Sequence, residues 1–279
     1  MKIINLVENT EGAACCGAEH GLSFYIETAK RRILMDTGAS DLFVKNAARM
    51  GVDLTTVDTV VLSHGHYDHG GGLAAFSKIN PEAEIYLQPS AFGAYYSRHE
   101  GEAPSYIGLS EKVRELPHLV MAEEFCDLGD GIHIFAGIGT EETVPGGNRD
   151  LKIRIGDSLE QDDFRHEQCL RIFEEGRSVL LSGCAHHGIL NVLKRYRQLY
   201  GDDPDAVISG FHMMQHDRYS EEDLEEIRRT AIKLTGMKTA FYTGHCTGPE
   251  PFAVMKGIMG GQLTYVHSGD VVDIRFACG

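Results

Sequence analysis

One segment organises this chain, and it reads Val60-Val61-Leu62-Ser63-His64-Gly65-His66-Tyr67-Asp68-His69-Gly70-Gly71-Gly72-Leu73. An apolar run is followed by three histidines and one aspartate within six residues, and then by three glycines. In extended backbone, side chains two positions apart share a face, so His64 and His66 can point the same way. Asp68 and His69 follow where the chain turns. Four nitrogen and oxygen donors can therefore occupy one small volume, and such donors suit zinc, iron or manganese.

The same order of features recurs three times further along the chain: an apolar strand, a turn of small residues, and a histidine. The repeats are Val179-Leu180-Leu181-Ser182-Gly183-Cys184-Ala185-His186, Ile208-Ser209-Gly210-Phe211-His212 and Phe241-Tyr242-Thr243-Gly244-His245. In α/β sheets, sites gather beyond the carboxyl ends of strands. We therefore expect His186 and His245 to be metal ligands, and His212 to lie behind them or to face the substrate. His187 points elsewhere in most local geometries, so we expect no role for it.

Composition and charge limit the classes of function. A chain of 279 residues, of which 42% are hydrophobic, suits one large α/β domain or two small ones. The formal net charge of −15 argues against nonspecific binding to nucleic acid or to an anionic membrane. It leaves room for a small-molecule substrate, even an anionic one, because a metal supplies local positive charge. The sequence does not indicate an oligomeric state.

The cysteines indicate the compartment. Seven are present, an odd number, and no two are spaced as Cys-x-x-Cys. A reducing compartment is therefore expected rather than a disulfide framework. No signal peptide and no apolar run of membrane-spanning length is evident, so we predict a cytoplasmic protein.

Hydrophobic periodicity and turn residues predict the elements of secondary structure. Strands are expected over residues 2–7, 22–26, 32–35, 57–62, 83–87, 132–136, 151–155, 167–173, 178–181, 206–208, 239–242, 263–266 and 271–276. Helices are expected over residues 40–50, 190–200, 220–234 and 251–259. No linker-like tract is present, so we predict a single domain over residues 1–279 in which two αβ halves pack sheet against sheet. The less regular residues 90–118 predict a lid or insertion beside the site, or an ordinary surface excursion.

The histidine segment resembles the signature of the metallo-β-lactamase superfamily. In this resemblance, His64 and His66 match residues that help to hold a first metal, and Asp68 and His69 match residues that help to hold a second. The resemblance implies fold class α/β, as a four-layer αββα sandwich of the metallo-β-lactamase type with the site at one edge between two sheets. It also implies one or two Zn²⁺ ions as cofactor, with Fe or Mn as alternatives.

Four further segments sharpen the resemblance. They are residues 19–27, 183–189, 209–212 and 243–248. Together with the histidine segment they resemble one branch of the superfamily. That branch is named for its similarity to the synthase that makes the pterin precursor of methanopterin from ribofuranosylaminobenzene 5′-phosphate.

One position departs from the family pattern. Hydrolytic members place a metal-bridging aspartate after the strand of the second half, where this chain has Cys184. Cys184 is therefore either a soft ligand that alters the choice of metal or a small buried residue beside the site. The family's third histidine is His166 or is replaced by His186, and we favour His186. Asp36 matches an acid that accepts a hydrogen bond from a metal-bound histidine, or it caps a turn.

These features predict a metal-dependent hydrolase that uses a metal-activated water, with Asp68 as the residue that orients this water. The substrate would be an ester, lactone, thioester or phosphoester of a small molecule. The alternatives are a pterin-precursor synthase-like transferase acting on a phosphorylated substrate, and a non-hydrolytic iron redox protein. Candidate substrate-binding residues, each of which also fits an ordinary surface position, are Arg149, Asn148, Arg98 and His20.

Overall fold

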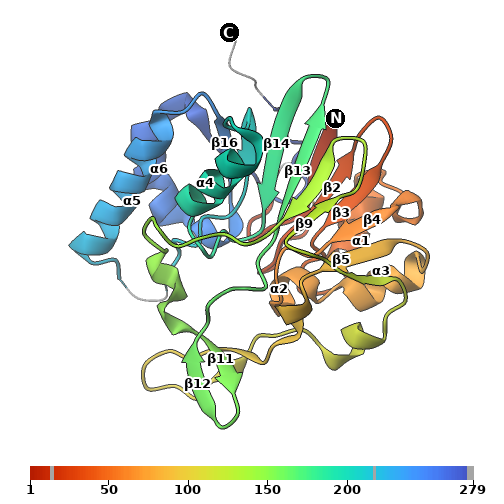
Figure 1. Ribbon diagram of the computed structural model, residues 1–279, viewed down its shortest axis with the longest axis horizontal. Helices are drawn as coiled ribbons and strands as arrows, with labels where there is room; N and C mark the ends of the chain where they lie inside the picture. Colours follow the sequence, from red (N-terminus) through yellow and green to blue (C-terminus); the bar gives the residue numbers. More distant parts are fainter. Residues whose placement is uncertain (13–15, 216–217, 275–279) are drawn as a thin grey trace.

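Two β-sheets lie face to face at the centre of the molecule, and helices cover the outer face of each (Figure 1). The computed structural model describes residues 1–12, 16–215 and 218–274. The first sheet contains, in spatial order, β1 (Lys2–Val7), β2 (Ser23–Glu27), β3 (Arg32–Met35), β4 (Thr59–Val61), β5 (Glu84–Leu87) and β8 (Leu119–Met121). Its outer face is covered by α1 (Leu42–Arg49) and α3 (Leu73–Ile79).

The second sheet mirrors this arrangement. In spatial order it contains β17 (Leu263–Tyr265), β16 (Ala240–Thr243), β15 (Ala206–Ile208), β14 (Arg177–Ser182), β13 (Cys169–Glu174), β10 (Ile132–Phe135) and β9 (Phe125–Asp127). Its outer face is covered by α4 (Ile189–Tyr200), α5 (Glu221–Thr235) and α6 (Pro249–Met259). Strands β14 to β17 run parallel, as do β3, β4, β5 and β8. Their carboxyl ends therefore meet at one edge, which is where a site is expected.

Three buried apolar clusters separate the four layers. One contains Val60 of β4 with Phe76 of α3, and another contains Leu180 of β14 with the helices of the second half. The middle cluster, between the sheets, contains Val61 and Leu181. Successive strand residues point to opposite faces of a sheet. Val60 and Val61 therefore lie in different clusters, and so do Leu180 and Leu181. This burial on both faces explains why the strands read as continuous apolar runs, and the predicted four-layer sandwich is confirmed.

A third, smaller sheet lies outside the sandwich. It contains β12 (Ser158–Gln161), β11 (Leu151–Ile155), β6 (Tyr95–Ser97) and β7 (Ser105–Tyr106), and the hairpin β11–β12 projects away from the two main sheets (Figure 1). Residues 90–118 supply two of these strands. They also lie beside the histidine segment, because the Tyr67 amide donates to the Ile107 carbonyl at 2.8 Å. The predicted lid or insertion at residues 90–118 thus forms two strands of this sheet. The other two strands come from residues 151–161.

The predicted last strand, over residues 271–276, is wrong for its described part. Val271 forms only an isolated bridge with Ile4. The segment touches the edge of β1 through single hydrogen bonds, such as Val272 N–H to the Ile3 carbonyl at 2.8 Å, and forms no continuous ladder. Residues 275–276 lie outside the described residues. Strands β6, β7, β8, β9 and β12 are not among the predicted ones. Helix α5 begins with a reciprocal pair of hydrogen bonds between Ser220 and Asp223.

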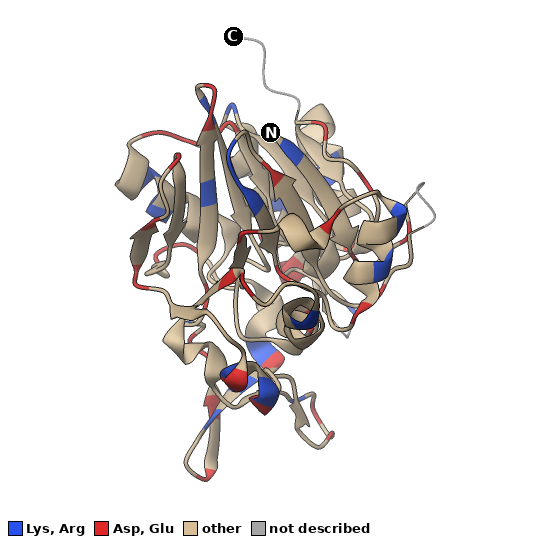
Figure 2. Ribbon diagram, turned by 90° about the vertical axis from the view of Figure 1, so that its right-hand side faces the viewer, with Lys and Arg blue, Asp and Glu red and all other residues tan. Residues whose placement is uncertain are grey.

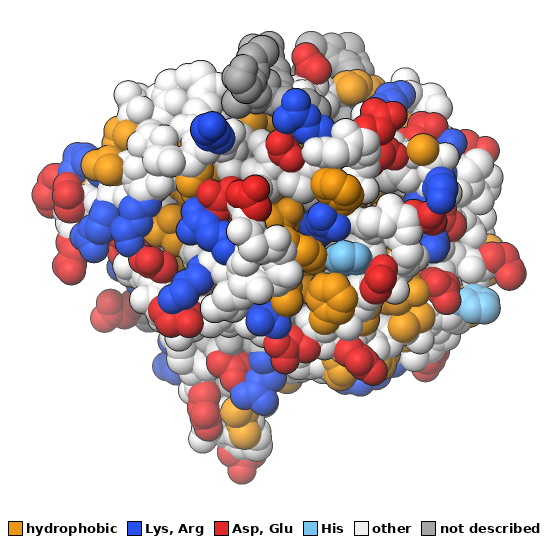
Figure 3. Space-filling model, turned by 45° about the horizontal axis from the view of Figure 1, so that its top comes forward, with side chains coloured by type: hydrophobic (Ala, Val, Ile, Leu, Met, Phe, Trp, Pro, Cys, Tyr) orange, Lys and Arg blue, Asp and Glu red, His pale blue; other side chains and the backbone are white. Residues whose placement is uncertain are grey.

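Charged residues of both signs are interspersed along the ribbon (Figure 2) and over the face seen in Figure 3. That face carries no unbroken band of lysine and arginine. The absence of nucleic-acid binding stays a prediction from the net charge. Among the described residues, no helix is both long and apolar enough to cross a membrane.

Candidate metal centre

The loops after four strands converge at one edge of the two sheets. The loop after β4 carries His64 and His66 and leads into the short helix α2 (Tyr67–Gly70), which carries Asp68 and His69. The loops after β14, β15 and β16 carry, in turn, Cys184 with His186, then His212, then His245. Glycine allows the two halves to approach closely, because a Cβ at Gly183 would lie 2.2 Å from the Ser63 hydroxyl oxygen. All of these histidines are buried except His212, which is half-buried.

The imidazole group consists of His64, His66 and His186, whose ligand atoms all lie within 4.8 Å of one another. The Nε2 atoms of His64 and His186 are 3.2 Å apart. The Nε2 atom of His66 is buried and has no hydrogen-bond partner among the described residues. Burial, with the neighbouring histidines, lowers the pKa of all three side chains well below the usual value. They are therefore neutral, which is the form that binds metals.

The mixed group consists of Asp68, His69 and His245. The Asp68 Oδ2 atom lies 3.5 Å from His69 Nε2 and 3.3 Å from His245 Nε2, and the two Nε2 atoms are 3.2 Å apart. Two ligands of one tetrahedral zinc ion lie roughly 3.3–3.8 Å apart, given the usual bond lengths. The three donors therefore have the spacing of ligands to a single ion.

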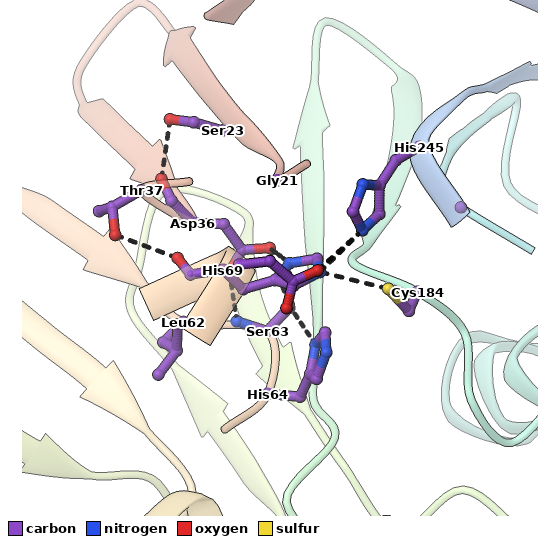
Figure 4. A network of polar contacts seen from close by, with 12 residues as sticks. Gly21, Ser23, Asp36, Thr37, Leu62, Ser63, His64, His69, Cys184 and His245 are labelled. Atoms are coloured by element: carbon purple, nitrogen blue, oxygen red, sulfur yellow. Dashed lines mark hydrogen bonds and ion pairs between the residues drawn. The ribbon is translucent and has the colours of Figure 1, made fainter. Parts of the chain in front are cut away.

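Outer partners orient histidines of both groups, and Figure 4 shows Asp36 and Ser63 beside His69 and His64. Three Nδ1 atoms contact a side-chain oxygen: that of Asn148 for His186 at 2.9 Å, of Asn9 for His245 at 2.8 Å, and of Asp36 for His69 at 2.7 Å. Asp36 also accepts hydrogen bonds from the amide and hydroxyl of Ser63, both at 2.7 Å. These contacts leave each Nε2 atom facing the centre, as metal-binding histidines usually do.

The two carboxylates change the charge of the mixed group. Burial by itself lowers the pKa of His69, but Asp68 and Asp36 outweigh it and raise the pKa to about 9. Burial opposes ionisation of Asp68, yet His69, His245 and His20 hold the pKa of its carboxyl well below the usual range. Without a metal, the mixed group is therefore an ion pair, and a bound cation would replace the proton on His69.

Cys184 lies between the two groups. Its Sγ atom is 3.2 Å from His69 Nε2, and it shares one potential donor set with His64 and His69 and another with His186 and His212. The thiol therefore lies within reach of donors from both groups. Burial raises the pKa of this thiol, and its contact with Cys246 raises it further.

Backbone strain is concentrated in these loops. Asp36, Ala185, His212 and His245 all have φ values between 49° and 59°, in the left-handed region that non-glycine residues rarely occupy. Each such residue costs on the order of 1 kcal/mol or more, and such positions cluster at functional sites. The surrounding structure thus holds four site residues in conformations that a free loop would avoid.

A cavity of about 440 Å³ opens beside both groups. Its lining includes His66, Asp68, Cys184, His186, His212 and His245. His20 and Arg149 also line it, and the His20 Nε2 atom lies 3.4 Å from Asp68 Oδ2. Arg149 is 56% exposed and pairs with Asp223. Arg98 is not among the described residues that line this cavity.

Several candidates occupy places that the sequence did not suggest. The amide of Asn148 contacts the His186 ring and donates to the His186 carbonyl at 2.7 Å, so in this structure it orients His186. His166 uses both ring nitrogens, at 2.9 Å from the Gly65 amide and 3.1 Å from Asp162. The structure thus brings His186, rather than His166, to His64 and His66. His187 points away and contacts Glu167 at 2.7 Å.

Sequence reasoning missed Cys246 and Asn9. Cys246 follows His245 directly and lines the cavity, and Asn9 orients His245 from 236 residues away. A cysteine next to a predicted ligand was the only available signal for the first. Nothing in the polar loop around Asn9 marks it, because its partner is supplied by the fold alone.

Comparisons with known proteins agree with this geometry. The family model described as "Metallo-beta-lactamase superfamily" matches residues 16–212, and the chain belongs to this superfamily. The superfamily fold implies that a divalent metal binds here, and the donor groups described above could hold one. The predicted family is therefore confirmed.

Similar proteins extend over nearly the whole chain. A relative from Methanocaldococcus jannaschii, named 7,8-dihydropterin-6-methyl-4-(beta-D-ribofuranosyl)-aminobenzene-5'-phosphate synthase, is 32% identical over 98% of this chain and 96% of its own. The crystal structure of a metal-dependent hydrolase of the beta-lactamase superfamily is 26% identical, with a TM-score of 0.82 over 98% of this chain and 99% of that one. Zn²⁺-bound PqqB from Methylobacterium extorquens, 14% identical with a TM-score of 0.58 over 98% of this chain and all of that one, shares the fold.

Proposed function

We propose that this protein is a metal-dependent hydrolase acting on an ester, lactone, thioester or phosphoester of a small molecule. The observation that carries the proposal is the presence of the imidazole group and the mixed group beside one cavity. Their spacing fits bound ions, and so does the His66 Nε2 atom, which makes no hydrogen bond among the described residues and has only Asp162 at 3.9 Å as a charged neighbour. When bound, a metal ion polarises the substrate and lowers the pKa of a water molecule to roughly 7.

Zinc is the ion we favour, with iron and manganese as alternatives. Neutral imidazoles, one carboxylate and a thiol form a donor set of intermediate softness. Such a set suits zinc better than magnesium or calcium, which prefer oxygen ligands. Metal analysis of the protein as isolated would identify the ion.

Asp68 is the residue we propose to orient the attacking water. It lines the cavity, and its carboxyl is ionised because the neighbouring histidines lower its pKa. An ionised carboxylate accepts a hydrogen bond from water and so fixes the direction of attack. Asp68→Asn keeps the shape but removes the charge, and should lower both metal content and turnover.

His212 is the residue we propose to face the substrate. Its ring lines the cavity next to His186, with the ring centroids 4.2 Å apart. Its Nδ1 atom has no hydrogen-bond partner among the described residues. We propose that the ring edge that lines the cavity contacts a polar group of the substrate, such as a leaving oxygen that needs a proton.

A second candidate function is transfer rather than hydrolysis. The observation that favours it is the 32% identity to the M. jannaschii synthase over nearly the full length of both chains. The substrate of this alternative carries a phosphate, for which Arg149 at the cavity rim is the candidate anchor. The same residues would then activate an organic nucleophile instead of water.

Labelled water distinguishes the two candidates. Zinc-loaded protein is incubated in ¹⁸O-labelled water with a set of aryl and ribosyl phosphoesters, lactones and thioesters, with and without an organic nucleophile. Hydrolysis places the label in the product, whereas transfer does not. A product whose formation requires the nucleophile and contains no label would reject hydrolysis. Equal activity of the parent and Asp68→Asn would show that the activity comes from elsewhere.

A further inference from the structure

Two thiols meet beside the mixed group. Cys184 Sγ, Cys246 Sγ and the ligand nitrogen of His245 all lie within 4.8 Å of one another, and all three residues are buried. The Cys246 thiol approaches the Cys184 carbonyl oxygen at 3.7 Å. Both cysteines also line the cavity. The two thiols are thus close enough to bind one metal ion together, and an ion can reach them from the cavity.

These thiols differ from an ordinary core cysteine of the same protein. Cys169 is fully buried and belongs to the apolar cluster under the helices of the second half. Cys184 and Cys246 belong to none of the three apolar clusters of the described residues, although both are buried. Their neighbours are ring nitrogens and each other, which is the environment of a ligand rather than of a packing residue.

The backbone leaves room for the second thiol. A Cβ at Gly210, in the loop after β15, would lie 2.4 Å from Cys246 Sγ. Any larger residue there would displace this thiol from its place next to Cys184. Glycine at this position therefore keeps the thiol in the centre.

His69 lies next to these three donors, on the side of Cys184. Its Nε2 atom lies 3.2 Å from Cys184 Sγ and 3.2 Å from His245 Nε2. Both distances are close to the roughly 3.3–3.8 Å that separates ligands on one tetrahedral zinc ion. Thiolates and imidazoles are donors that zinc commonly takes together in proteins.

We propose that Cys184 and Cys246 form a dithiol that binds a thiophilic divalent ion together with His245, with His69 beside Cys184. The inference rests on the proposed metal centre. It adds Cys246 as a metal ligand, and it adds a preference of the centre for certain metal ions. The dithiol makes this position favour zinc, cadmium or cobalt over manganese and magnesium, because thiolates are soft ligands. Binding releases the two thiol protons to solvent and changes no oxidation state.

Cobalt(II) substitution tests the inference, because cobalt bound to thiolates shows a sulfur-to-metal charge-transfer band in the near ultraviolet. The parent chain, loaded with Co²⁺ under reducing conditions, should show this band. Cys184→Ser and Cys246→Ser should each lose roughly half of its intensity, and the double variant should lose it all, because the site has two sulfur ligands. Cys126→Ser is the matched control, since Cys126 is a thiol on β9 outside the centre, and it should keep the full band.

The outcomes separate this inference from the proposed function. If the parent binds cobalt without the band, or if Cys246→Ser keeps the full band, the dithiol is rejected while the metal centre stands. If the parent binds neither cobalt nor zinc, both are rejected.

Alkylation of the unaltered chain gives an independent result should a variant fail to fold. Zinc should protect Cys184 and Cys246, but not Cys126, from iodoacetamide, as read by peptide mass mapping. Equal labelling of Cys246 with and without zinc would overturn the inference.

Discussion

The imidazole group and the mixed group lie side by side, yet their electrostatics differ. The imidazole group has three neutral rings, with the uncharged Ser63 and Asn148 behind two of them and one carboxylate, that of Asp162, 3.9 Å from His66 Nε2. The mixed group has the carboxylate of Asp68 in the centre and that of Asp36 behind His69. A buried cation is stabilised far more by a nearby charge than by dipoles alone. Two metal ions bound to these groups would therefore not be bound equally tightly. We expect the mixed group to bind an ion first.

The largest expected effect comes from removing the charge that distinguishes the two groups. Asp68→Ala should weaken the tighter of two zinc-binding steps on the order of 100- to 1,000-fold, because a unit charge at about 4 Å is worth about 4 kcal/mol at an effective dielectric constant of 20. Zinc titration by calorimetry against a competing chelator measures both steps. Loss of the weaker step alone would reverse the proposed order of filling.

The next prediction addresses the other group. His186→Ala should abolish the weaker zinc step and leave the tighter one within roughly threefold of the parent, because His186 belongs to the imidazole group and is not one of the three donors of the mixed group. His187→Ala is the matched control, since the adjacent ring contacts Glu167 instead. The same titration serves for both variants. If His187→Ala loses zinc as His186→Ala does, the site depends on the loop as a whole and not on one ring.

The outer partners should have smaller and separable effects. Asn148→Ala should weaken only the imidazole step and Asn9→Ala only the mixed step, each by roughly 10- to 100-fold, which is typical when the partner of a metal-binding histidine is removed. Asn148 contacts the Nδ1 atom of His186, whereas Asn9 contacts that of His245 and, at 3.4 Å, that of His20. Titration of both variants should therefore give opposite patterns. Identical patterns would mean that the two positions are not independent.

The same comparison shows how far the sequence could predict this centre. His64, Asp68 and His69 lie within six residues of one another, so chain geometry alone brings their donors together. His186 and His245 come singly, and only the convergence of strand ends predicts them. Their outer partners are 38 and 236 residues away, and no periodicity connects such pairs. A local cluster of potential ligands in the sequence therefore predicted part of the metal centre. The distant residues that orient His186 and His245 could not be predicted in this way.

The fold shows the same division. Apart from the edge strands β8 and β9, the strands of the two main sheets were predicted because both of their faces are buried, which produces long hydrophobic runs. Of the small third sheet only β11 was predicted, and its pairing with β6 was not, because the two strands are more than 50 residues apart and partly exposed. Residues 271–274, the described part of the predicted strand at 271–276, form only single hydrogen bonds at the edge of β1. The hydrophobic pattern of a segment predicts whether it is buried. Whether the segment pairs as a strand depends on whether the fold places another strand beside it.

The mildest change we expect is that of a substitution at the cavity rim, which should affect substrate binding and not metal binding. Arg149 follows Asn148, the partner of the imidazole group, and its exposed side chain pairs only with Asp223 among the ion pairs of the described residues. An exposed pair of this kind contributes little to folding, so Arg149→Ala should change the free energy of unfolding by less than about 1 kcal/mol. It should leave both zinc steps unchanged, because no donor atom of either group depends on it.

What Arg149→Ala should change is substrate binding. If the substrate carries a phosphate, KM should rise about tenfold with kcat unchanged, because a charge-assisted hydrogen bond of roughly 1.5–3 kcal/mol is lost and is partly screened by solvent. Arg98→Ala is the matched control, since Arg98 is outside the lining of the cavity. The effect should shrink with increasing salt and vanish for the dephosphorylated substrate. An equal rise in KM for both substrates would show that Arg149 shapes the rim instead of anchoring an anion, and would favour an uncharged ester or lactone.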